Sequence, residues 1–253
     1  MDPMTTNDII GLVLVYGLIV AALVLSLIVE KKLPNIDNRK VVHIGVGNFV
    51  FVWWMFTQSW VMLAFFTIPF AVILFIAMFR GNAISESKLG ELTRKGHNTG
   101  LFLYAITITV LVVLFFKDGV LAMLGVTGPY NEHWLAASIA IMAMTYGDGF
   151  GSVVGRRIGK HKIIHGKSLE GSIGVFCATT IMTCVMFALF EAINGLTLNG
   201  ITYWFDTSGV LPWFVIAPLA GLLSAVLEAI CNGDYDNFVN PIIIGLMLVA
   251  LGL

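Results

Sequence analysis

Residues 8–29 read DIIGLVLVYGLIVAALVLSLIV and contain a single charge, that of Asp8. A helix that crosses the hydrocarbon core of a bilayer needs about 20 mainly apolar residues, and this stretch supplies them. Seven more apolar runs follow, so that the candidate spans are 8–29, 41–58, 60–79, 100–117, 133–150, 171–193, 210–231 and 236–253. The fifth run is the least regular, because the apolar patch Gly119–Val126 can extend the fourth. The sequence predicts an all-α, polytopic integral membrane helix bundle with seven or eight transmembrane helices.

Composition agrees with this class. Hydrophobic residues make up 58% of the chain and charged residues 11%, with a mean hydropathy of +0.92, whereas globular domains contain about 25% charged residues. The runs lack the period-two alternation of barrel strands, so helices must satisfy the backbone in lipid. No repeat or low-complexity segment interrupts residues 1–253, which we expect to form one membrane domain. The first run has no signal-peptide features, so we expect a retained helix. Nothing resembles a transit peptide, which favours a prokaryotic plasma membrane protein or an organellar protein written without its leader.

Charge in the loops predicts the orientation. With eight spans and the N-terminus outside, the inside loops are 30–40, 80–99, 151–170 and 232–235. These loops hold thirteen of the fourteen Lys and Arg residues, and Lys117 is the exception. Positive charge accumulates on the cytoplasmic side of membrane proteins. We therefore expect a multi-pass protein whose basic loops, and any site they form, face the cytoplasm.

The densest charge lies in residues 147–172, GDGFGSVVGRRIGKHKIIHGKSLEGS, which contain five basic residues and two acids. Ionisable groups near bilayer depth cost a few kcal/mol each, so this cluster is a candidate functional site. Glycines recur every four residues, at Gly147, Gly151, Gly155 and Gly159, and such a stripe lets another helix approach closely. Asp148, Ser152 and Arg156 follow one position later and share a helix face. Packing accounts for the glycines but not for Asp148.

The end of this run resembles part of a phosphate-binding loop. Gly166-Lys167-Ser168 matches the last residues of a Walker A motif, but His161 stands where that motif has Gly and no strand precedes it. A P-loop fold is therefore excluded. The local chemistry still favours phosphate, through glycine N–H groups, a lysine and a following helix N-terminus. Ser168 can equally be the N-cap of that helix, and Glu170 suits its dipole.

Two other interpretations apply to the same loop. His161 and His165 are four residues apart, but without a third ligand they do not predict zinc. The cations Arg157, Lys160 and Lys162 are also suited to anionic membrane lipid headgroups.

A second constellation lies near the C-terminus. Glu228 falls inside an apolar run, which is costly unless it faces a polar cavity. Asp236 and Asn237 carry oxygen atoms of the kind that Mg²⁺ binds. The predicted topology places all three on the same side as Asp148, whereas residues 232–234 need only turn chemistry.

Together these motifs resemble those of the polyprenol kinase family, the membrane lipid kinases that include phytol kinase, dolichol kinase and CTP-dependent diacylglycerol kinase. The run 147–172 is similar to the family signature, and Glu228, Asp236, Asn237 and Pro241 are similar to its Glu…Asp-Asn…Pro element. Arg39-Lys40-Val41-Val42-His43 and Glu91–Gly96 resemble two shorter elements. The resemblance implies phosphoryl transfer from CTP, or another nucleoside triphosphate, to the hydroxyl of a long-chain lipid alcohol such as phytol, geranylgeraniol or a polyprenol.

Phosphoryl transfer requires positioning, charge neutralisation and a divalent metal, and the candidate residues divide into these roles. Asp148, Asp236 and Asn237 are candidate Mg²⁺ ligands, one of the two acids being alternatively the base for the alcohol proton. Candidate nucleotide-binding residues are Arg156, Lys160, Lys167, Ser152, Ser168, Gly147, Gly149 and Gly166. Glu170 is expected to orient Lys167 or to bind the metal through water. Lys40, His43 and Glu228 are expected to line the same cavity.

Two other functions remain open at this stage. A CTP-dependent phospholipid cytidylyltransferase would use the same cations and metal, and a transporter for a phosphorylated solute would surround a midplane site with broken helices. No nucleic-acid partner is expected. The glycine stripe is compatible with a homodimer as well as with an internal contact.

Overall fold

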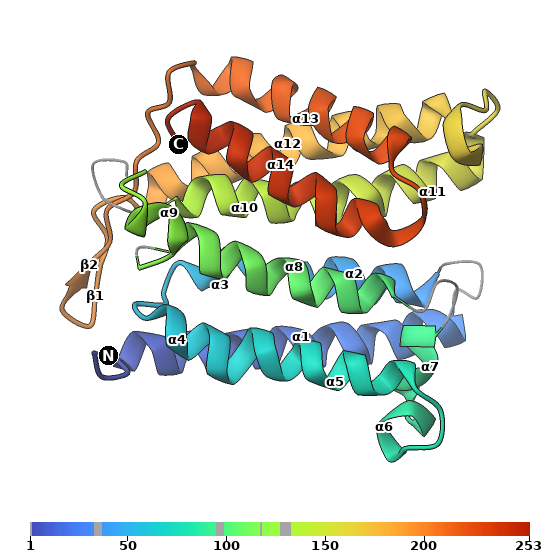
Figure 1. The fold of residues 1–253 in the computed structure, drawn as a ribbon, viewed down its shortest axis with the longest axis horizontal. Coiled ribbons are helices and arrows are strands. Elements are labelled where there is room, and N and C mark those ends of the chain that lie inside the picture. Colours follow the sequence, from blue (N-terminus) through green and yellow to red (C-terminus); the bar gives the residue numbers. More distant parts are fainter. Residues whose placement is uncertain (1, 33–36, 95–98, 117, 127–132) are drawn as a thin grey trace. The chain divides into compact units, whose positions relative to one another are not determined.

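The computed structural model describes residues 2–253 except 33–36, 95–98, 117 and 127–132. The chain forms two compact units, residues 1–110 and 111–253 (Figure 1). The described part is almost entirely helical, and its only sheet is one short hairpin. This confirms the predicted all-α class, while the prediction of a single domain for 1–253 stays a prediction.

The first unit is built from apolar helices with short connections. Its elements are α1 (Thr6–Lys32), α2 (Asn38–Gly47), α3 (Val50–Trp53), α4 (Ser59–Met62), the π-helical turn η1 (Leu63–Thr67), α5 (Ile68–Met78), α6 (Ala83–Glu86) and α7 (Lys88–Arg94). The helix α8 (Gly100–Phe115) begins in this unit and ends in the second. Asp8, fully buried, fixes the start of α1: its carboxylate accepts hydrogen bonds from the backbone N–H and hydroxyl groups of both Thr5 and Thr57.

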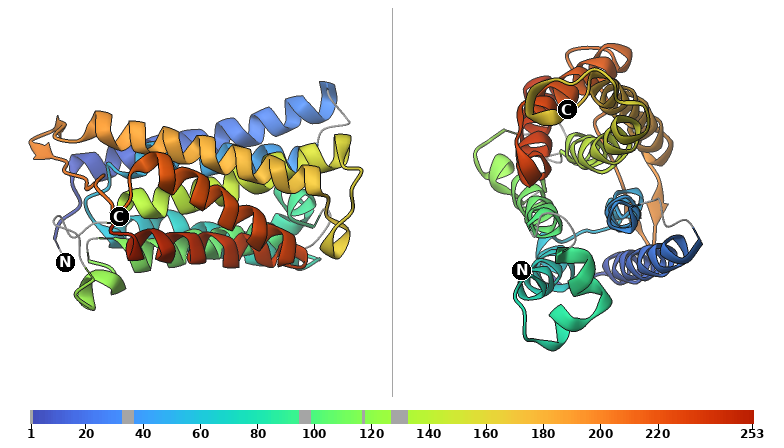
Figure 2. Two further views of the ribbon diagram at one scale, coloured as in Figure 1. Left: turned by 90° about the horizontal axis from the view of Figure 1, so that it is seen from above. Right: turned by 90° about the vertical axis from the view of Figure 1, so that its right-hand side faces the viewer.

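The second unit surrounds a fully buried helix. Its elements are α9 (Val120–Met123), α10 (Trp134–Met142), the π-helical turn η2 (Ala143–Gly147), α11 (Asp148–Ile158), the 3-10 turn η3 (Ile164–Gly166), α12 (Leu169–Ile193), β1 (Thr197–Leu198), β2 (Ile201–Thr202), α13 (Trp213–Ile230), the 3-10 turn η4 (Gly233–Tyr235) and α14 (Asp236–Ala250). Every residue of α10 is buried. The helix α12 packs against α11 and α13, and α14 packs against α10 and α13 (Figure 2).

Five helical segments of the described chain are long and apolar enough to cross a bilayer. They are Thr6–Lys32, Ser59–Met78, Gly100–Met123, Leu169–Ile193 and Trp213–Ile230. Side chains such as Val13 and Val20 on α1 are exposed, as expected where a helix faces lipid. The runs 41–58, 133–150 and 236–253 are also mostly helical, but none of them forms a helix that is both long and apolar enough to be counted with these five. Membrane helices are therefore supported, and the count of seven or eight stays a prediction.

Candidate active site

The first part of the site is the helix that carries Asp148. The helices α10 and α11 continue into each other through η2, whose π-helical turn ends at Gly147, immediately before Asp148. Such turns insert a residue into a helix and re-aim the side chains that follow; they are frequent at functional sites. Asp148 is 9% exposed, so its carboxylate faces the interior of the unit.

The glycine stripe is the contact surface between α11 and α12. A Cβ atom at Gly147 would lie 2.7 Å from Oγ1 of Thr179, and one at Gly151 would lie 2.4 Å from a methyl carbon of Val175. Both distances are shorter than a normal contact, so only glycine allows the two helices this approach. The predicted close contact of helices is confirmed. Gly147 faces Thr179 across this contact, and its predicted role toward phosphate, like that of Gly149, stays a prediction.

The loop between α11 and α12, residues 159–168, folds back on itself as a hairpin joined by a single bridge, and this hairpin, distinct from β1–β2, presents Lys167. Ile163 N–H donates to the Lys167 carbonyl at 2.9 Å, and Leu169 N–H donates to the His161 carbonyl at 2.9 Å. Two consecutive residues reverse the chain in the left-handed region, His165 with φ 55° and Gly166 with φ 75°. Glycine adopts this conformation without the steric cost that a side chain incurs.

Both ends of this hairpin are held by helix α12. The Ser168 hydroxyl accepts a hydrogen bond from Gly171 N–H at 3.2 Å, which confirms the predicted N-cap. The Glu170 carboxylate accepts from Lys160 N–H at 3.1 Å and from Nδ1 of His161 at 2.7 Å. These contacts hold the first part of the hairpin, because Lys160 and His161 cross the N-terminus of α12. The expected roles of Glu170, to orient Lys167 or to bind the metal through water, stay predictions.

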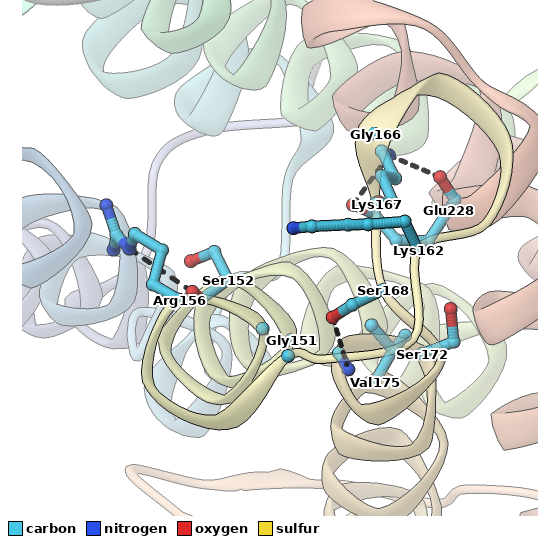
Figure 3. A pocket seen from close by; sticks show the side chains of 13 residues that line it. Gly151, Ser152, Arg156, Lys162, Gly166, Lys167, Ser168, Ser172, Val175 and Glu228 are labelled. Carbon is cyan, nitrogen blue, oxygen red and sulfur yellow. Dashed lines mark hydrogen bonds and ion pairs between the residues drawn. The ribbon is translucent and has the colours of Figure 1, made fainter.

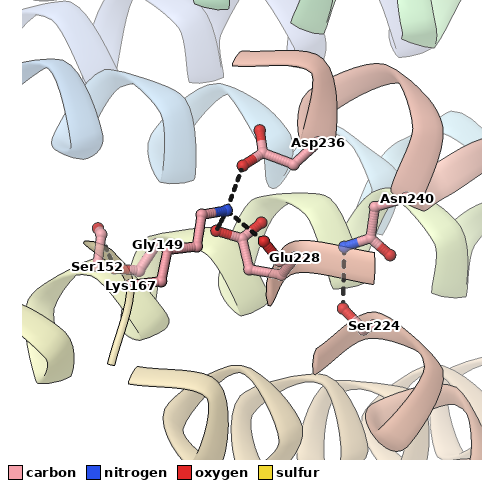
Figure 4. A network of polar contacts seen from close by, with 7 residues as sticks. All are labelled: Gly149, Ser152, Lys167, Ser224, Glu228, Asp236 and Asn240. Atoms are coloured by element: carbon pink, nitrogen blue, oxygen red, sulfur yellow. Dashed lines mark hydrogen bonds and ion pairs between the residues drawn. The ribbon is translucent and has the colours of Figure 1, made fainter. Parts of the chain in front are cut away.

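Lys167 is the centre of the polar network (Figure 4). Its ammonium group donates to Oε1 of Glu228 at 2.8 Å, to Oδ2 of Asp236 at 3.1 Å and to the backbone carbonyl of Glu228. Burial by itself lowers the pKa of Lys167, but the carboxylates of Glu228 and Asp236 outweigh this effect and raise the pKa above its ordinary value of 10.5. Lys167 is therefore a permanent cation at neutral pH.

Two carboxylates from two helices pair with this cation, and a third lies close enough for its charge to act on both. Glu228 is near the end of α13 and Asp236 begins α14. The charge of Asp148, on α11, acts on both of them. The structure thus brings together Asp148 and Asp236, which are 88 positions apart in the sequence. Their catalytic and metal-binding roles stay predictions, as does that of the buried neighbour Asn237.

A cavity of about 380 Å³ opens beside the network (Figure 3). Its polar lining comes from α11, the hairpin, α12 and α13, and includes Ser152, Arg156, Lys162, Lys167, Ser168, Ser172 and Glu228. Glycines 151, 155, 159, 166 and 171 and Val175 complete the wall. Of the predicted nucleotide-binding residues, Ser152, Arg156, Gly166, Lys167 and Ser168 line this cavity, whereas Lys160, Gly147 and Gly149 do not.

Lys162 and Ser172 are additional polar residues of the cavity. The sequence interpretation grouped Lys162 with lipid-binding cations. In the structure, Lys162 pairs with Ser168 across the hairpin, and its side chain extends over the cavity (Figure 3). Nothing in the spacing of the basic residues separates Lys162 from its neighbours, because the pairing of the hairpin decides which of them face inward.

Lys40 and His43 lie in the first unit, on α2. Tyr104 donates a hydrogen bond to the His43 carbonyl at 3.2 Å, and the two rings have centroids 4.2 Å apart. The expected place of Lys40 and His43 in the active-site cavity stays a prediction.

Among the described residues, no group of three His, Cys, Asp or Glu side chains is arranged to hold a metal ion. The ammonium group of Lys167 supplies the positive charge between two of the clustered acids instead.

Comparison with known proteins identifies relatives over most of the chain. A phytol kinase from Synechocystis sp. is 28% identical over 223 residues, which cover 86% of this chain and 79% of that protein. A probable chloroplastic phytol kinase from Triticum aestivum is 26% identical, covering 84% of this chain and 66% of the relative. A chloroplastic farnesol kinase from Arabidopsis thaliana is 24% identical, with 79% and 60% covered.

The chain thus spans less than two thirds of the length of these two plant relatives. No family model matches the chain, and no solved structure does. The similarity to named phytol and farnesol kinases, extending over most of the chain, supports its membership of the polyprenol and phytol kinase family.

Proposed function

We propose that the protein is a membrane lipid-alcohol kinase, which transfers a phosphoryl group from a nucleoside triphosphate to the hydroxyl of a long-chain isoprenoid alcohol. The observation that carries the proposal is the pairing of Glu228 and Asp236 with Lys167, within reach of the charge of Asp148 and beside a cavity lined by further cations. The relatives named phytol kinase and farnesol kinase support this class of substrate.

The cavity suits the phosphate groups of a nucleotide. Its volume of about 380 Å³ falls in the range of small-molecule sites, about 300–1,000 Å³. Arg156 and Lys162 approach it from α11 and from the hairpin, so that cations face it from two sides. Guanidinium and ammonium groups bind phosphate oxygens through charge-assisted hydrogen bonds. The donor that we propose is CTP, on the resemblance of the central motif, with other nucleoside triphosphates as alternatives.

The chemistry of the acids fits Mg²⁺. The cluster offers only oxygen ligands, which this hard cation prefers. Oε2 of Glu228 is buried and accepts no hydrogen bond from the residues that the structure describes. We propose that Asp148, Asp236 and Asn237 hold the metal, with Glu228 beside them. A bound Mg²⁺ would neutralise charge on the transferring phosphate.

The same acids supply the proton chemistry of the acceptor. An alcohol loses its proton as its oxygen attacks phosphorus, and a carboxylate within hydrogen-bond distance can accept that proton. We propose that Asp148 or Asp236 serves as this base. In the absence of substrate, Lys167 forms ion pairs with Glu228 and Asp236. Lys167 also lines the cavity, where it can contact a phosphate oxygen.

The test is phosphorylation by purified protein with Mg²⁺, each of four labelled nucleotides and a panel of lipid alcohols. A kinase acting with CTP releases CDP, whereas a cytidylyltransferase releases pyrophosphate. Asp148→Asn should lower kcat by about 10³-fold or more, because the site loses a metal ligand or base. The matched control is Asp206→Asn, since Asp206 is only half-buried and, among the described residues, accepts its hydrogen bonds from Ser208 in its own loop. Equal activity of both variants would refute the assignment of Asp148.

We also propose that the site faces the cytoplasm of a prokaryotic cell. The support is the clustering of basic residues in the loops. Cysteines engineered at positions 160 and 235 should react with an impermeant thiol reagent from the same side of the membrane. Reaction from opposite sides would contradict a composite site.

A further inference from the structure

A second polar layer lies one helical turn deeper than the acids. Ser224 precedes Glu228 by four residues on α13, and Asn240 follows Asp236 by four on α14. Nδ2 of Asn240 donates to Oγ of Ser224 at 3.0 Å, and Oγ1 of Thr179 on α12 donates to the same atom at 3.3 Å (Figure 4 shows the first contact). All three side chains of this second layer are at most 1% exposed.

The hydrogen-bonding capacity of Asn240 is not used up. Its Oδ1 is buried and accepts no hydrogen bond from the described residues. If the amide is turned by 180°, Ser224 can donate to Oδ1 and the N–H groups become the unsatisfied end. In either orientation, one end of the amide bonds Ser224 and the other presents an unsatisfied polar atom. A buried polar atom without a partner is unfavourable, so a ligand that pairs with it would bind favourably here.

The second layer lies between the acid cluster and the apolar interior. One turn further along α14 and α13, the fully buried residues are apolar, Ile244 and Ala220. On the other side, Ser224 and Val175 both approach Gly147, where a Cβ atom would lie 3.4 Å from Oγ of Ser224 and 3.4 Å from Cγ1 of Val175. Val175 lines the cavity.

We propose that Asn240 and Ser224 recognise the hydroxyl of the lipid alcohol, an inference that rests on the proposed function. A hydroxyl both donates and accepts a hydrogen bond, so it satisfies Asn240 in either orientation of the amide. A hydrocarbon does neither and leaves the amide unsatisfied. The second layer therefore selects an alcohol from the hydrocarbon of the bilayer and holds it beside the acid cluster.

The experiment compares Asn240→Leu with wild type in steady-state kinetics with phytol and CTP. We expect the KM for phytol to rise about ten-fold, the loss of one to two hydrogen bonds, with the KM for CTP unchanged within two-fold. Ser224→Ala should raise the KM for phytol several-fold and serves where Asn240→Leu does not fold. The matched control is Thr183→Val, because the buried Thr183 hydroxyl donates within α12, to the Thr179 carbonyl.

A binding measurement separates this inference from the proposed function. Displacement of labelled phytol by unlabelled phytol and by phytane, its saturated hydrocarbon, is measured without nucleotide. Wild type should prefer the alcohol, and Asn240→Leu should lose most of that preference. Absence of phosphorylation by wild type refutes the kinase, while the binding preference still decides the role of Asn240. If Asn240→Leu leaves the preference for phytol unchanged, or raises the KM for phytol and for CTP equally, the proposal that the second layer recognises the hydroxyl is wrong.

Discussion

Removal of the Lys167 ammonium should destabilise the protein more than removal of any neighbouring cation. In Lys167→Met, a side chain of similar length leaves Glu228 and Asp236 without the cation that pairs with both, while the charge of Asp148 still acts on them. Breaking a buried ion pair by deleting one partner costs about 3–5 kcal/mol. The Lys167 side chain is 25% exposed, and partial hydration of the site reduces the expected loss to about 2–4 kcal/mol. For a chain of this size, that is a fall in Tm of about 5–12 °C.

The assay is thermal unfolding in a neutral detergent at pH 7, followed by circular dichroism. The matched control is Lys162→Met, since the Lys162 ammonium lines the same cavity and forms no ion pair with the described part of the chain; its loss should cost less than about 0.5 kcal/mol. Glu228→Gln should be less harmful in the Lys167→Met background than alone, because it removes repulsion between acids. Equal Tm values for the two lysine variants would refute the central role of Lys167.

The pH dependence of the same difference has a defined sign. The pKa of Lys167 is raised in the folded protein, so its contribution is complete below the ordinary pKa of 10.5 and disappears as pH rises through the higher folded value. The Tm difference between wild type and Lys167→Met should therefore stay constant between about pH 8 and 10 and shrink only above that range. A difference that falls between pH 8 and 9 would mean that Lys167 is not held charged by the two acids.

Two further substitutions test the packing of each unit by the same unfolding assay. Gly151→Ala should lower the free energy of unfolding by about 1–3 kcal/mol, because its new methyl group would lie 2.4 Å from Val175. The control Gly17→Ala, where nothing lies within 4 Å, should leave it unchanged. Equal effects of the two substitutions would contradict the α11–α12 contact. Asp8→Asn should lower the free energy of unfolding by about 1–3 kcal/mol, because an amide cannot accept all the hydrogen bonds that Thr5 and Thr57 donate to the carboxylate. An unchanged Tm would show that the negative charge of Asp8 is dispensable.

Local features were predictable from the sequence because they depend on neighbouring residues. The apolar run at 8–29 became a helix over Thr6–Lys32, and Ser168 caps the helix that starts beside it. The four-residue spacing of Gly147 and Gly151 predicted a close helix contact but not its partner, since any apolar helix could have filled that role. Only packing identified α12.

The contacts that the sequence did not predict depend on pairing between distant segments. Glu170 accepts a hydrogen bond from His161, because the hairpin folds back over the start of α12. Lys162 faces the cavity for the same reason. Asn240 follows Asp236 by four residues and so shares its helix face, but only the packing of α13 against α14 shows that it bonds Ser224.

By itself, the sequence determined that this protein has the pattern of a helical membrane protein. Its apolar runs are long enough for a bilayer, and nearly all of its Lys and Arg residues lie in a few loops. Tertiary structure decided which charges meet. Lys167 lies 61 positions from Glu228 and 69 from Asp236, and no local pattern encodes such a contact. The physical reason is that hydrophobicity and helix formation act over one or two turns, whereas an ion pair depends on how α12, α13 and α14 pack against one another.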